Sequence, residues 1–192
     1  LSKESEIILD IGANNGIYSL VASAMNNKAK TYAFEPNSLY TPTLKNNINI
    51  NKYQNRLFPI ELAVGEKTGI CEIDDYSMSG KKIKCEAISI DEYVNKVNLQ
   101  KIDLIKIDVE YYEPFVIRGL LNTIEKYKPS ILIEILSDEI ADELYQLLCE
   151  FDYFYFNIDE NLGIRKVLKL TKSDSFNFLL CTEEIAQKLK II

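Results

Sequence analysis

The chain has 192 residues, 47% of them hydrophobic, and a formal net charge of −7. This acidic balance argues against a nucleic-acid partner, because phosphate contacts need clustered Lys and Arg side chains, which this sequence scatters. No apolar run approaches the roughly 20 residues that span a bilayer, so we also expect no membrane partner. Length and composition predict one globular domain covering residues 1–192.

The four cysteines show no C-x-x-C spacing, and the chain contains no histidine. We therefore do not expect a zinc site, and any general base must be Asp, Glu, Lys or Tyr. Cys71 and Cys85 flank a predicted hairpin and are candidates for cross-strand neighbours. We nevertheless expect buried free thiols, as in a cytoplasmic protein kept reduced. The chain begins with Leu1 rather than Met, which leaves open whether further sequence precedes it.

A short apolar run followed by a glycine-containing turn opens the fold. Residues 7–9 predict a buried strand, the segment from Gly12 to Gly16 predicts a turn, and a helical pattern follows. We expect the two glycines to let the backbone approach a bound ligand closely. The N-terminus of the helix offers unpaired N–H groups to a phosphate or carboxylate.

An acidic residue closes the second predicted strand, residues 30–34. This residue, Glu35, lies 23 positions after Gly12. In a βαβ unit that spacing brings the carboxylate beside the first turn, where it can accept hydrogen bonds from ribose hydroxyls. The turn and the carboxylate together predict an adenosine-containing cofactor.

The rest of the chain alternates between helix-like and strand-like segments. We predict helices at 37–50, 114–127 and 138–151, a short helix opening at 90–93, and strands at 57–64, 102–107, 130–136, 153–156 and 176–182. Residues 70–74 and 83–88 resemble an inserted antiparallel pair. The connecting residues 75–82 form either a plain hairpin loop or the edge of a lid over a substrate pocket. Residues 157–175 are polar and expected to be rich in loops. This alternation predicts an α/β fold with a mostly parallel sheet.

Carboxylates gather at the end of the central predicted strand. Asp108 and Glu110 follow this strand directly, at the edge where open α/β sheets bind ligands, and we predict a functional role for both. Lys106 lies inside the strand and needs a carboxylate partner, for which Glu134 in the next predicted strand is the obvious candidate. Glu113 is expected to be a helix-start charge favoured by the helix dipole.

The glycine pattern separates two kinds of cofactor. Of the three glycines in the dinucleotide fingerprint only the first, Gly12, is present, and no basic residue in the turn could neutralise a pyrophosphate. The segment from Asp10 to Gly16 instead resembles the first motif of class I S-adenosylmethionine-dependent methyltransferases, with Asn14 in place of the middle glycine.

Five short motifs make the resemblance more specific. They are D-I-G-A-N-N-G at 10–16, A-F-E-P-N at 33–37, L-A-V-G-E-K-T-G at 62–69, I-D-L-I-K-I-D-V-E-Y-Y-E at 102–113 and K-P-S-I-L-I-E-I at 128–135. In this order they resemble the FkbM-type methyltransferase family, from about Glu6 to Phe156. The most diagnostic family motif is D-V-E-G-x-E, in which Tyr111 here replaces the usual glycine. We expect this replacement to narrow the pocket or to alter the acceptor.

The resemblance implies a Rossmann-like class I methyltransferase fold, with helices on both faces of a sheet of six parallel strands and one antiparallel strand. It also implies methyl transfer from S-adenosylmethionine to a hydroxyl of a small molecule, commonly a sugar or a secondary metabolite. The cofactor-binding residues that it implies are Asp10, Gly12, Ala13, Asn14, Gly16, Glu35, Pro36, Asn37, Ala63 and Asp108.

Three carboxylates are candidates for catalysis, because an alcohol is a poor nucleophile unless a base or a cation assists it. Glu110 is the preferred base, Glu134 is its rival, and by resemblance Asp108 lies near the methionine moiety and the acceptor. Alternatively the same three side chains hold Mg²⁺. An NAD-type nucleotide-binding oxidoreductase and a non-catalytic cofactor-binding domain remain as other functions. The acceptor and the oligomeric state stay open.

Overall fold

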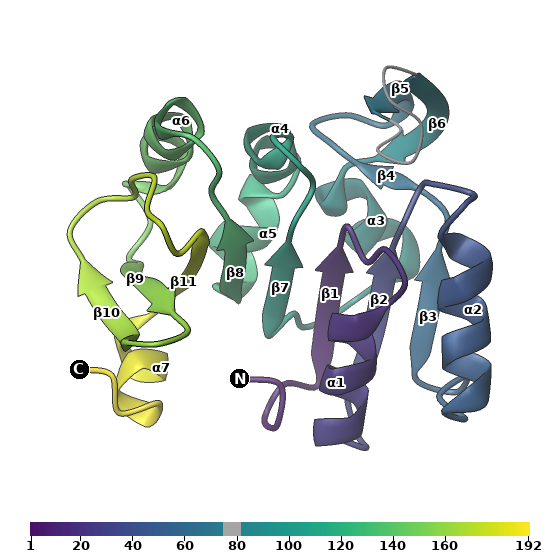
Figure 1. The fold of residues 1–192 in the computed structure, drawn as a ribbon, viewed down its shortest axis with the longest axis horizontal. Helices are drawn as coiled ribbons and strands as arrows, with labels where there is room; N and C mark the ends of the chain where they lie inside the picture. The colour runs from purple at the N-terminus through teal and green to yellow at the C-terminus, as the bar shows by residue number, and fades with distance from the viewer. Residues whose placement is uncertain (75–81) are drawn as a thin grey trace.

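A computed structural model of the chain describes residues 1–74 and 82–192 (Figure 1). The main sheet has eight strands: β1 (Ile7–Ile11), β2 (Lys30–Phe34), β3 (Leu57–Ile60), β7 (Leu104–Ile107), β8 (Ser130–Glu134), β9 (Phe154–Asp159), β10 (Gly163–Val167) and β11 (Asn177–Cys181). A smaller sheet contains β4 (Ala63–Val64), β5 (Gly69–Asp74) and β6 (Lys82–Ile88). The link predicted at 75–82, as loop or lid edge, falls outside the described residues except for its last position.

The strand order of the main sheet is β10-β9-β11-β8-β7-β1-β2-β3. Strands β3, β2, β1, β7 and β8 pair in parallel, whereas β11 is antiparallel to both β8 and β9. The chain runs outward from β1 to β3 and then returns to β7 on the other side of β1. The carboxyl ends of β1 and β7 therefore form a topological switch point, where sheets of this type bind ligands.

The helices are α1 (Ile17–Met25), α2 (Thr41–Ile50), α3 (Ile90–Val97), α4 (Glu113–Arg118), α5 (Leu121–Tyr127), α6 (Asp138–Leu148) and α7 (Glu183–Lys188). Successive residues of a strand point to opposite sides, so a central strand with apolar residues on both sides needs helices on both faces of the sheet. The helices accordingly cover both faces. In β1, Ile8 packs with Ala22 of α1, whereas Leu9 joins the large core cluster that includes Ile90 of α3 and Ile124 of α5. Figure 1 accordingly shows α1 in front of the sheet and α5 behind it. The predicted α/β class is confirmed.

Side-chain caps explain where two of the helices begin. The Ser89 hydroxyl accepts a hydrogen bond from the N–H of Glu92 at the start of α3, and Ser137 accepts one from Ile140 at the start of α6. Such caps satisfy backbone donors that have no partner inside the helix. Among the described residues no helix is long and apolar enough to cross a bilayer.

The strand predicted at 57–64 is two strands in different sheets. After β3 the chain leaves the main sheet, and Ala63 and Val64 pair with β6 instead. Pro59 fits the observed position of β3, because proline lacks an N–H and is tolerated on an edge strand such as this one.

The helix predicted at 114–127 is interrupted, and α4 and α5 are separated by Gly119 and Leu120. A Cβ added to Gly119 would lie 2.0 Å from the carbonyl oxygen of Gly65, so two segments of backbone touch at this point. The interruption thus coincides with a tertiary contact that the helical pattern does not reveal.

The segment 157–175 was expected to be rich in loops. It contains the last three residues of β9 and all of β10, and these two strands pair in an antiparallel hairpin. The sheet consequently has eight strands rather than seven, with β10 and β11 opposed to the other six. Four of the five β10 residues are exposed, which explains why no hydrophobic pattern marked this strand.

The cysteines differ from expectation in their burial. Cys181 is buried, but Cys71 and Cys85 are half-buried and Cys149 is exposed; all four are free. The expectation that Cys71 and Cys85 are cross-strand neighbours is confirmed, because they are directly paired between β5 and β6.

Candidate active site

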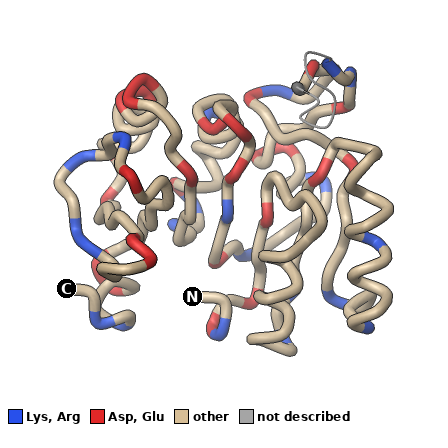
Figure 2. The backbone as a smooth tube through the Cα atoms, in the orientation of Figure 1, with Lys and Arg blue, Asp and Glu red and all other residues tan. Residues whose placement is uncertain are grey.

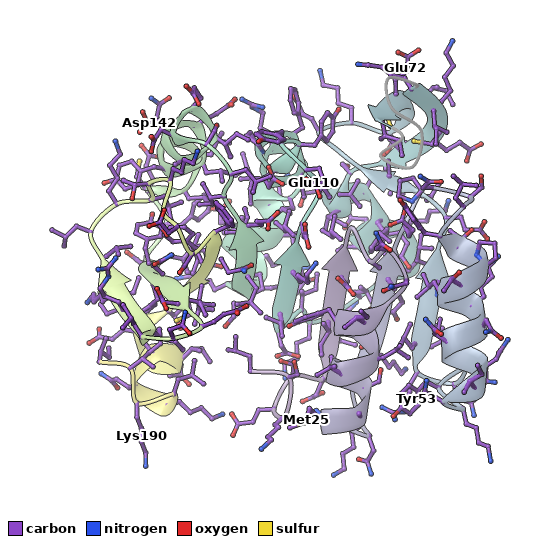
Figure 3. The ribbon with its side chains drawn as sticks, viewed as in Figure 1. Met25, Tyr53, Glu72, Glu110, Asp142 and Lys190 are labelled. Carbon is purple, nitrogen blue, oxygen red and sulfur yellow. The ribbon has the colours of Figure 1, made fainter. Side chains whose placement is uncertain are left out.

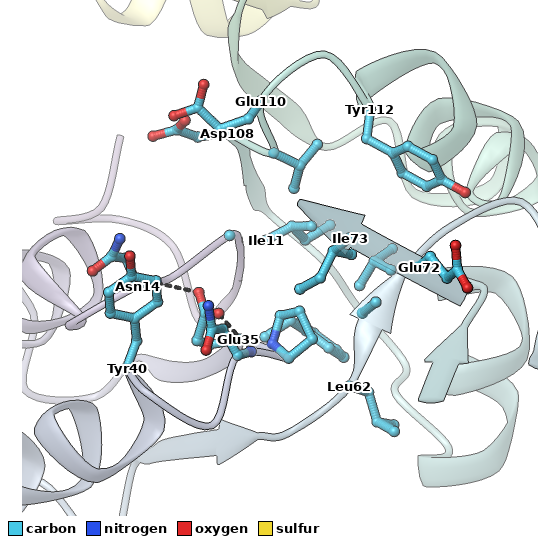
Figure 4. A pocket seen from close by; sticks show the side chains of 17 residues that line it. Ile11, Asn14, Glu35, Tyr40, Leu62, Glu72, Ile73, Asp108, Glu110 and Tyr112 are labelled. Atoms are coloured by element: carbon cyan, nitrogen blue, oxygen red, sulfur yellow. Dashed lines mark hydrogen bonds between the residues drawn. The ribbon is translucent and has the colours of Figure 1, made fainter. Parts of the chain in front are cut away.

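A pocket opens at the carboxyl ends of β1, β2 and β7 and is bordered on its other side by β4 and β5 (Figure 4). Eight of the residues predicted to form the site line it: Gly12, Asn14, Glu35, Pro36, Asn37, Ala63, Asp108 and Glu110. Four others, Asp10, Ala13, Gly16 and Glu134, are not part of its lining. The predicted residues thus divide into a group that faces the pocket and a group that supports it.

The turn after β1 has three residues in the left-handed region: Gly12 (φ 81°), Asn14 (φ 51°) and Gly16 (φ 86°). A Cβ on Gly12 would lie 1.8 Å from the backbone oxygen of Asp108, and a Cβ on Gly16 would lie 2.4 Å from a methyl carbon of Leu44. The glycines were expected to make room for a ligand. In the structure they are required first by contacts within the protein itself.

Asp10 supports the turn from below. It is fully buried, and its Oδ2 accepts hydrogen bonds from the N–H of Ser19 (3.1 Å) and from the Ser19 hydroxyl (2.5 Å). Its Oδ1 lies 3.8 Å from Nζ of Lys106. Burial raises the pKa of Asp10, and the nearby Lys106 charge opposes this rise. Asp10 therefore joins the first turn of α1 to β7.

Glu35 holds two loops together at one end of the pocket. Its Oε2 accepts a hydrogen bond from the N–H of Asn14 and its Oε1 accepts one from the N–H of Asn37, both at 2.8 Å (Figure 4). The side chain is buried, and this burial raises its pKa. Each carboxylate oxygen has a second lone pair. Glu35 can therefore keep both backbone contacts and still accept hydrogen bonds from a ligand.

The opposite end of the pocket is acidic. Figures 2 and 3 show acidic residues at the upper edge of the main sheet, with Glu110 labelled there. Asp108 and Glu110 line the pocket, and Glu134 ends the neighbouring strand β8, where the register brings it beside Asp108. Burial raises the pKa of Glu134 to about 7, and the negative charges of Asp108, Glu110 and Glu113 add to the rise. The three predicted catalytic carboxylates are thus brought together.

Lys106 does not pair with Glu134 as expected. Its Nζ lies 2.9 Å from Oδ2 of Asp108 and 3.8 Å from Oδ1 of Asp10. The strand register explains this choice, because Lys106 is opposite Asp10 on β1 but opposite Leu132 on β8. The lysine therefore binds the two aspartates at the switch point.

The turn after β7 is held by Glu113. This side chain is fully buried, and its Oε1 accepts a hydrogen bond from the N–H of Val109 at 3.2 Å. Burial raises its pKa to about 7. Glu113 does lie in the first turn of α4, as expected for a helix-start charge. No pattern in the sequence indicates that Glu113 is also buried, and so its part in shaping the turn was not predicted.

The same turn contains two consecutive non-glycine residues with positive φ, Glu110 (53°) and Tyr111 (73°). Side chains with a Cβ rarely adopt this conformation, which suits glycine. Tyr111 is also 57% exposed, so little packing compensates for the strain. Tyr111, which stands where the family motif has glycine, is therefore held in a strained backbone conformation.

Sequence reasoning did not identify the apolar wall of the pocket. Phe34, Leu62, Val64, Ile73 and Tyr112 line it. These residues look like ordinary core or hairpin positions in the sequence, and only the packing of the small sheet against the ends of the main strands brings them together. Across residues 1–74 and 82–192, no group of three or more Cys, Asp or Glu side chains is arranged to hold a metal ion. The geometry therefore gives no support to the Mg²⁺ alternative.

Residues 10–155 match the methyltransferase FkbM domain. The chain belongs to this family. The recognition made from the sequence motifs is confirmed, and this chain accordingly contains a methyltransferase domain.

Two curated relatives are each 24% identical to this chain over the aligned residues. The hexuronic acid methyltransferase AglP of Haloferax volcanii aligns over 158 residues, which cover 78% of this chain and 64% of AglP. The AMB antimetabolite synthetase AmbE of Pseudomonas aeruginosa aligns over 160 residues, covering 59% of this chain but 8% of AmbE. The chain thus spans less than two thirds of the length of either relative.

Solved structures show the same fold. The methyltransferase FkbM of Methylobacillus flagellatus has a TM-score of 0.64 at 21% identity, with 92% of this chain and 43% of that chain covered. An O-methyltransferase of Bacillus cereus in complex with S-adenosylhomocysteine has a TM-score of 0.56 at 12% identity, covering 94% of this chain and 76% of the other. The predicted class I methyltransferase fold is confirmed.

Replacement of Tyr111 by Gly should stabilise the protein by about 0.5–1 kcal/mol. The strain of the left-handed conformation, about 1–2 kcal/mol, is removed, and the greater freedom of glycine in the unfolded chain offsets part of the gain. Tyr111→Ala is the matched control, because it removes the same ring but keeps the Cβ. Thermal unfolding should give a higher Tm for the Gly variant than for the Ala variant, and equal values would contradict the strain argument.

The buried Glu113 should make stability depend on pH. Its folded pKa of about 7 exceeds its ordinary value of 4.5, so the folded state binds more protons and its stabilising contribution is lost as pH rises through this range. Between pH 4.5 and 7.5 the Glu113→Gln variant should gain about 1–3 kcal/mol relative to the wild type. Urea unfolding at several pH values measures this difference, and parallel curves for the two proteins would exclude the effect.

Proposed function

We propose that the domain transfers the methyl group of S-adenosylmethionine to a hydroxyl of a small molecule, with a sugar or a secondary metabolite as the acceptor. The observation that carries this proposal is the form of the pocket in a member of the FkbM family. A buried carboxylate that is held by two backbone N–H groups lies at one end, and the carboxylates of Asp108 and Glu110 line the other.

The residues present fit S-adenosylmethionine. Glu35 would accept hydrogen bonds from the ribose, the wall formed by Phe34, Leu62 and Ile73 would contact the adenine, and Asp108 would face the methionine moiety. The cofactor is cationic at its sulfonium, so a pocket bordered by carboxylates suits its charge. When bound, the cofactor supplies an electrophilic methyl group whose transfer needs little besides alignment and a proton acceptor.

The protein's own contribution to the reaction is orientation and proton removal. Glu110 lines the pocket next to Asp108 and would accept the proton of the acceptor hydroxyl. Glu134 lies behind Asp108, outside the lining, and would influence the reaction through its charge.

The charge of this end also bears on the acceptor. Lys106 offsets the charge of Asp108, but the charge of Glu110 beside it would repel an anionic acceptor, so a neutral sugar hydroxyl fits better than a hydroxyl on a uronate. AglP is named as a hexuronic acid methyltransferase. Comparison of the two kinds of sugar therefore tests whether this chain shares the substrate of that relative.

S-adenosylhomocysteine should stabilise the protein, since a ligand at 100 times its Kd adds about 2.7 kcal/mol to the free energy of unfolding. For a chain of this length the gain corresponds to about 5–10 °C in Tm. NADH should produce no comparable shift. The opposite pattern, a shift with NADH alone, would favour the oxidoreductase alternative and exclude the proposed cofactor.

The same titration tests the role of Glu35. Glu35→Ala should weaken S-adenosylhomocysteine binding by about 1.5–3 kcal/mol, the scale of hydrogen bonds to a charged group. Glu61→Ala is the control, because Glu61 is exposed, pairs with Lys45 and lies outside the pocket lining. Isothermal calorimetry measures both affinities. An affinity of Glu35→Ala equal to that of the control would remove Glu35 from the site.

Glu110→Gln should lower turnover by about 10²–10⁴ while S-adenosylhomocysteine affinity and Tm stay close to wild type. Release of S-adenosylhomocysteine in the presence of methyl glucoside or methyl glucuronide reports the rate. Glu134→Gln is the matched comparison. If Glu134 were the base, the wild-type rate would rise with pH through about 7 and this dependence would disappear in Glu134→Gln. Full turnover by Glu110→Gln would end its candidacy.

A further inference from the structure

Cys71 and Cys85 face each other on the small sheet. They are directly opposite in the antiparallel register of β5 and β6, and their Sγ atoms lie 3.3 Å apart. Residues opposite each other in such a pair have Cβ atoms about 4.5–5.5 Å apart, close to the separation that a disulfide spans. Both side chains are half-buried, which leaves them within reach of small oxidants.

This thiol pair borders the pocket. Glu72 and Ile73, which follow Cys71 on β5, both line the pocket (Figure 4). Burial raises the pKa of the pocket residue Tyr112, and the two cysteines add to this rise. The charge of Glu35 likewise contributes to the raised pKa of Cys85. The thiols therefore lie close to both the apolar wall and the carboxylate of the proposed cofactor site.

We propose that Cys71 and Cys85 form a reversible redox modification site, in which oxidation by a disulfide such as oxidised glutathione joins β5 to β6. One thiol of the pair attacks a sulfur of the oxidant and releases one glutathione thiolate. The other thiol then attacks the mixed disulfide and releases the second, and the two cysteine protons pass to the two released thiolates. Burial and the neighbouring Cys71 raise the pKa of Cys85.

The consequence for the pocket rests on the proposed function. A covalent link restricts the positions of Glu72 and Ile73. The conformational entropy that this wall loses when a ligand binds is therefore smaller. The oxidised protein therefore binds S-adenosylhomocysteine more tightly than the reduced protein. Because linkage is reciprocal, the bound ligand favours the disulfide by the same factor.

The first experiment follows the disulfide itself. Reduced protein is equilibrated in mixtures of reduced and oxidised glutathione, the remaining thiols are alkylated, and intact mass and peptide mapping identify the link. We expect a Cys71–Cys85 disulfide in the wild type and in Cys149→Ser, whose exposed cysteine is unrelated to the pair. Cys85→Ser and, as a second variant, Cys71→Ser should give only a mixed disulfide with glutathione. Two alkylated thiols in the wild type, even in oxidised glutathione alone, would overturn the proposal.

The second experiment measures coupling to the pocket. Calorimetric titration with S-adenosylhomocysteine should give a Kd at least about threefold lower for the oxidised than for the reduced wild type. Cys71→Ser/Cys85→Ser, treated in the same mixtures, should show no difference between them. Equal affinities of the two wild-type forms would overturn the coupling. If neither form binds the ligand, the proposed function fails, whereas the mass measurement still decides whether the redox site exists.

Discussion

The close approach of two backbone segments at the switch point is the constraint on which the site depends. The turn after β1 passes so near the end of β7 that a Cβ on Gly12 would lie 1.8 Å from the backbone oxygen of Asp108. The N–H of Asp108 also donates a hydrogen bond to the carbonyl of Ile11 at 3.0 Å. This contact places the glycine turn, Glu35 and Asp108 around one pocket. A side chain at position 12 would separate them.

Buried carboxylates carry much of the remaining organisation. Glu35 and Glu113 accept hydrogen bonds from backbone N–H groups of the loops that shape the pocket, and Asp10 accepts two from Ser19 at the start of α1. Burial raises the pKa of all three. The site is thus built from acids that hold loops in place, and their burial costs the folded state stability at neutral pH. Side chains with shifted pKa values are common at functional sites.

The pocket has two walls of different character. One wall is formed by the carboxyl ends of β1, β2 and β7, which are inner strands of the main sheet. The other is formed by the three-stranded sheet of β4, β5 and β6, which carries Ile73 and the thiol pair. A ligand in this pocket would contact both the main sheet and a hairpin that a single covalent bond could restrict. The proposed redox site follows from this division.

The sequence by itself determined the α/β class, the family and the residues at the strand ends, because glycines and carboxylates after apolar strands are local signals. Gly12, Glu35, Asp108 and Glu110 could all be located in this way. Only the tertiary structure decided what touches them. Strand register placed Lys106 opposite Asp10, so that the lysine pairs with Asp108 and Asp10 instead of Glu134, and packing buried Glu113. At Gly119, where the predicted helix is interrupted, the backbone touches that of Gly65. Each of these outcomes depends on which distant segment comes to lie beside a residue. Residue type and periodicity describe only the local chain, so they do not predict that neighbour.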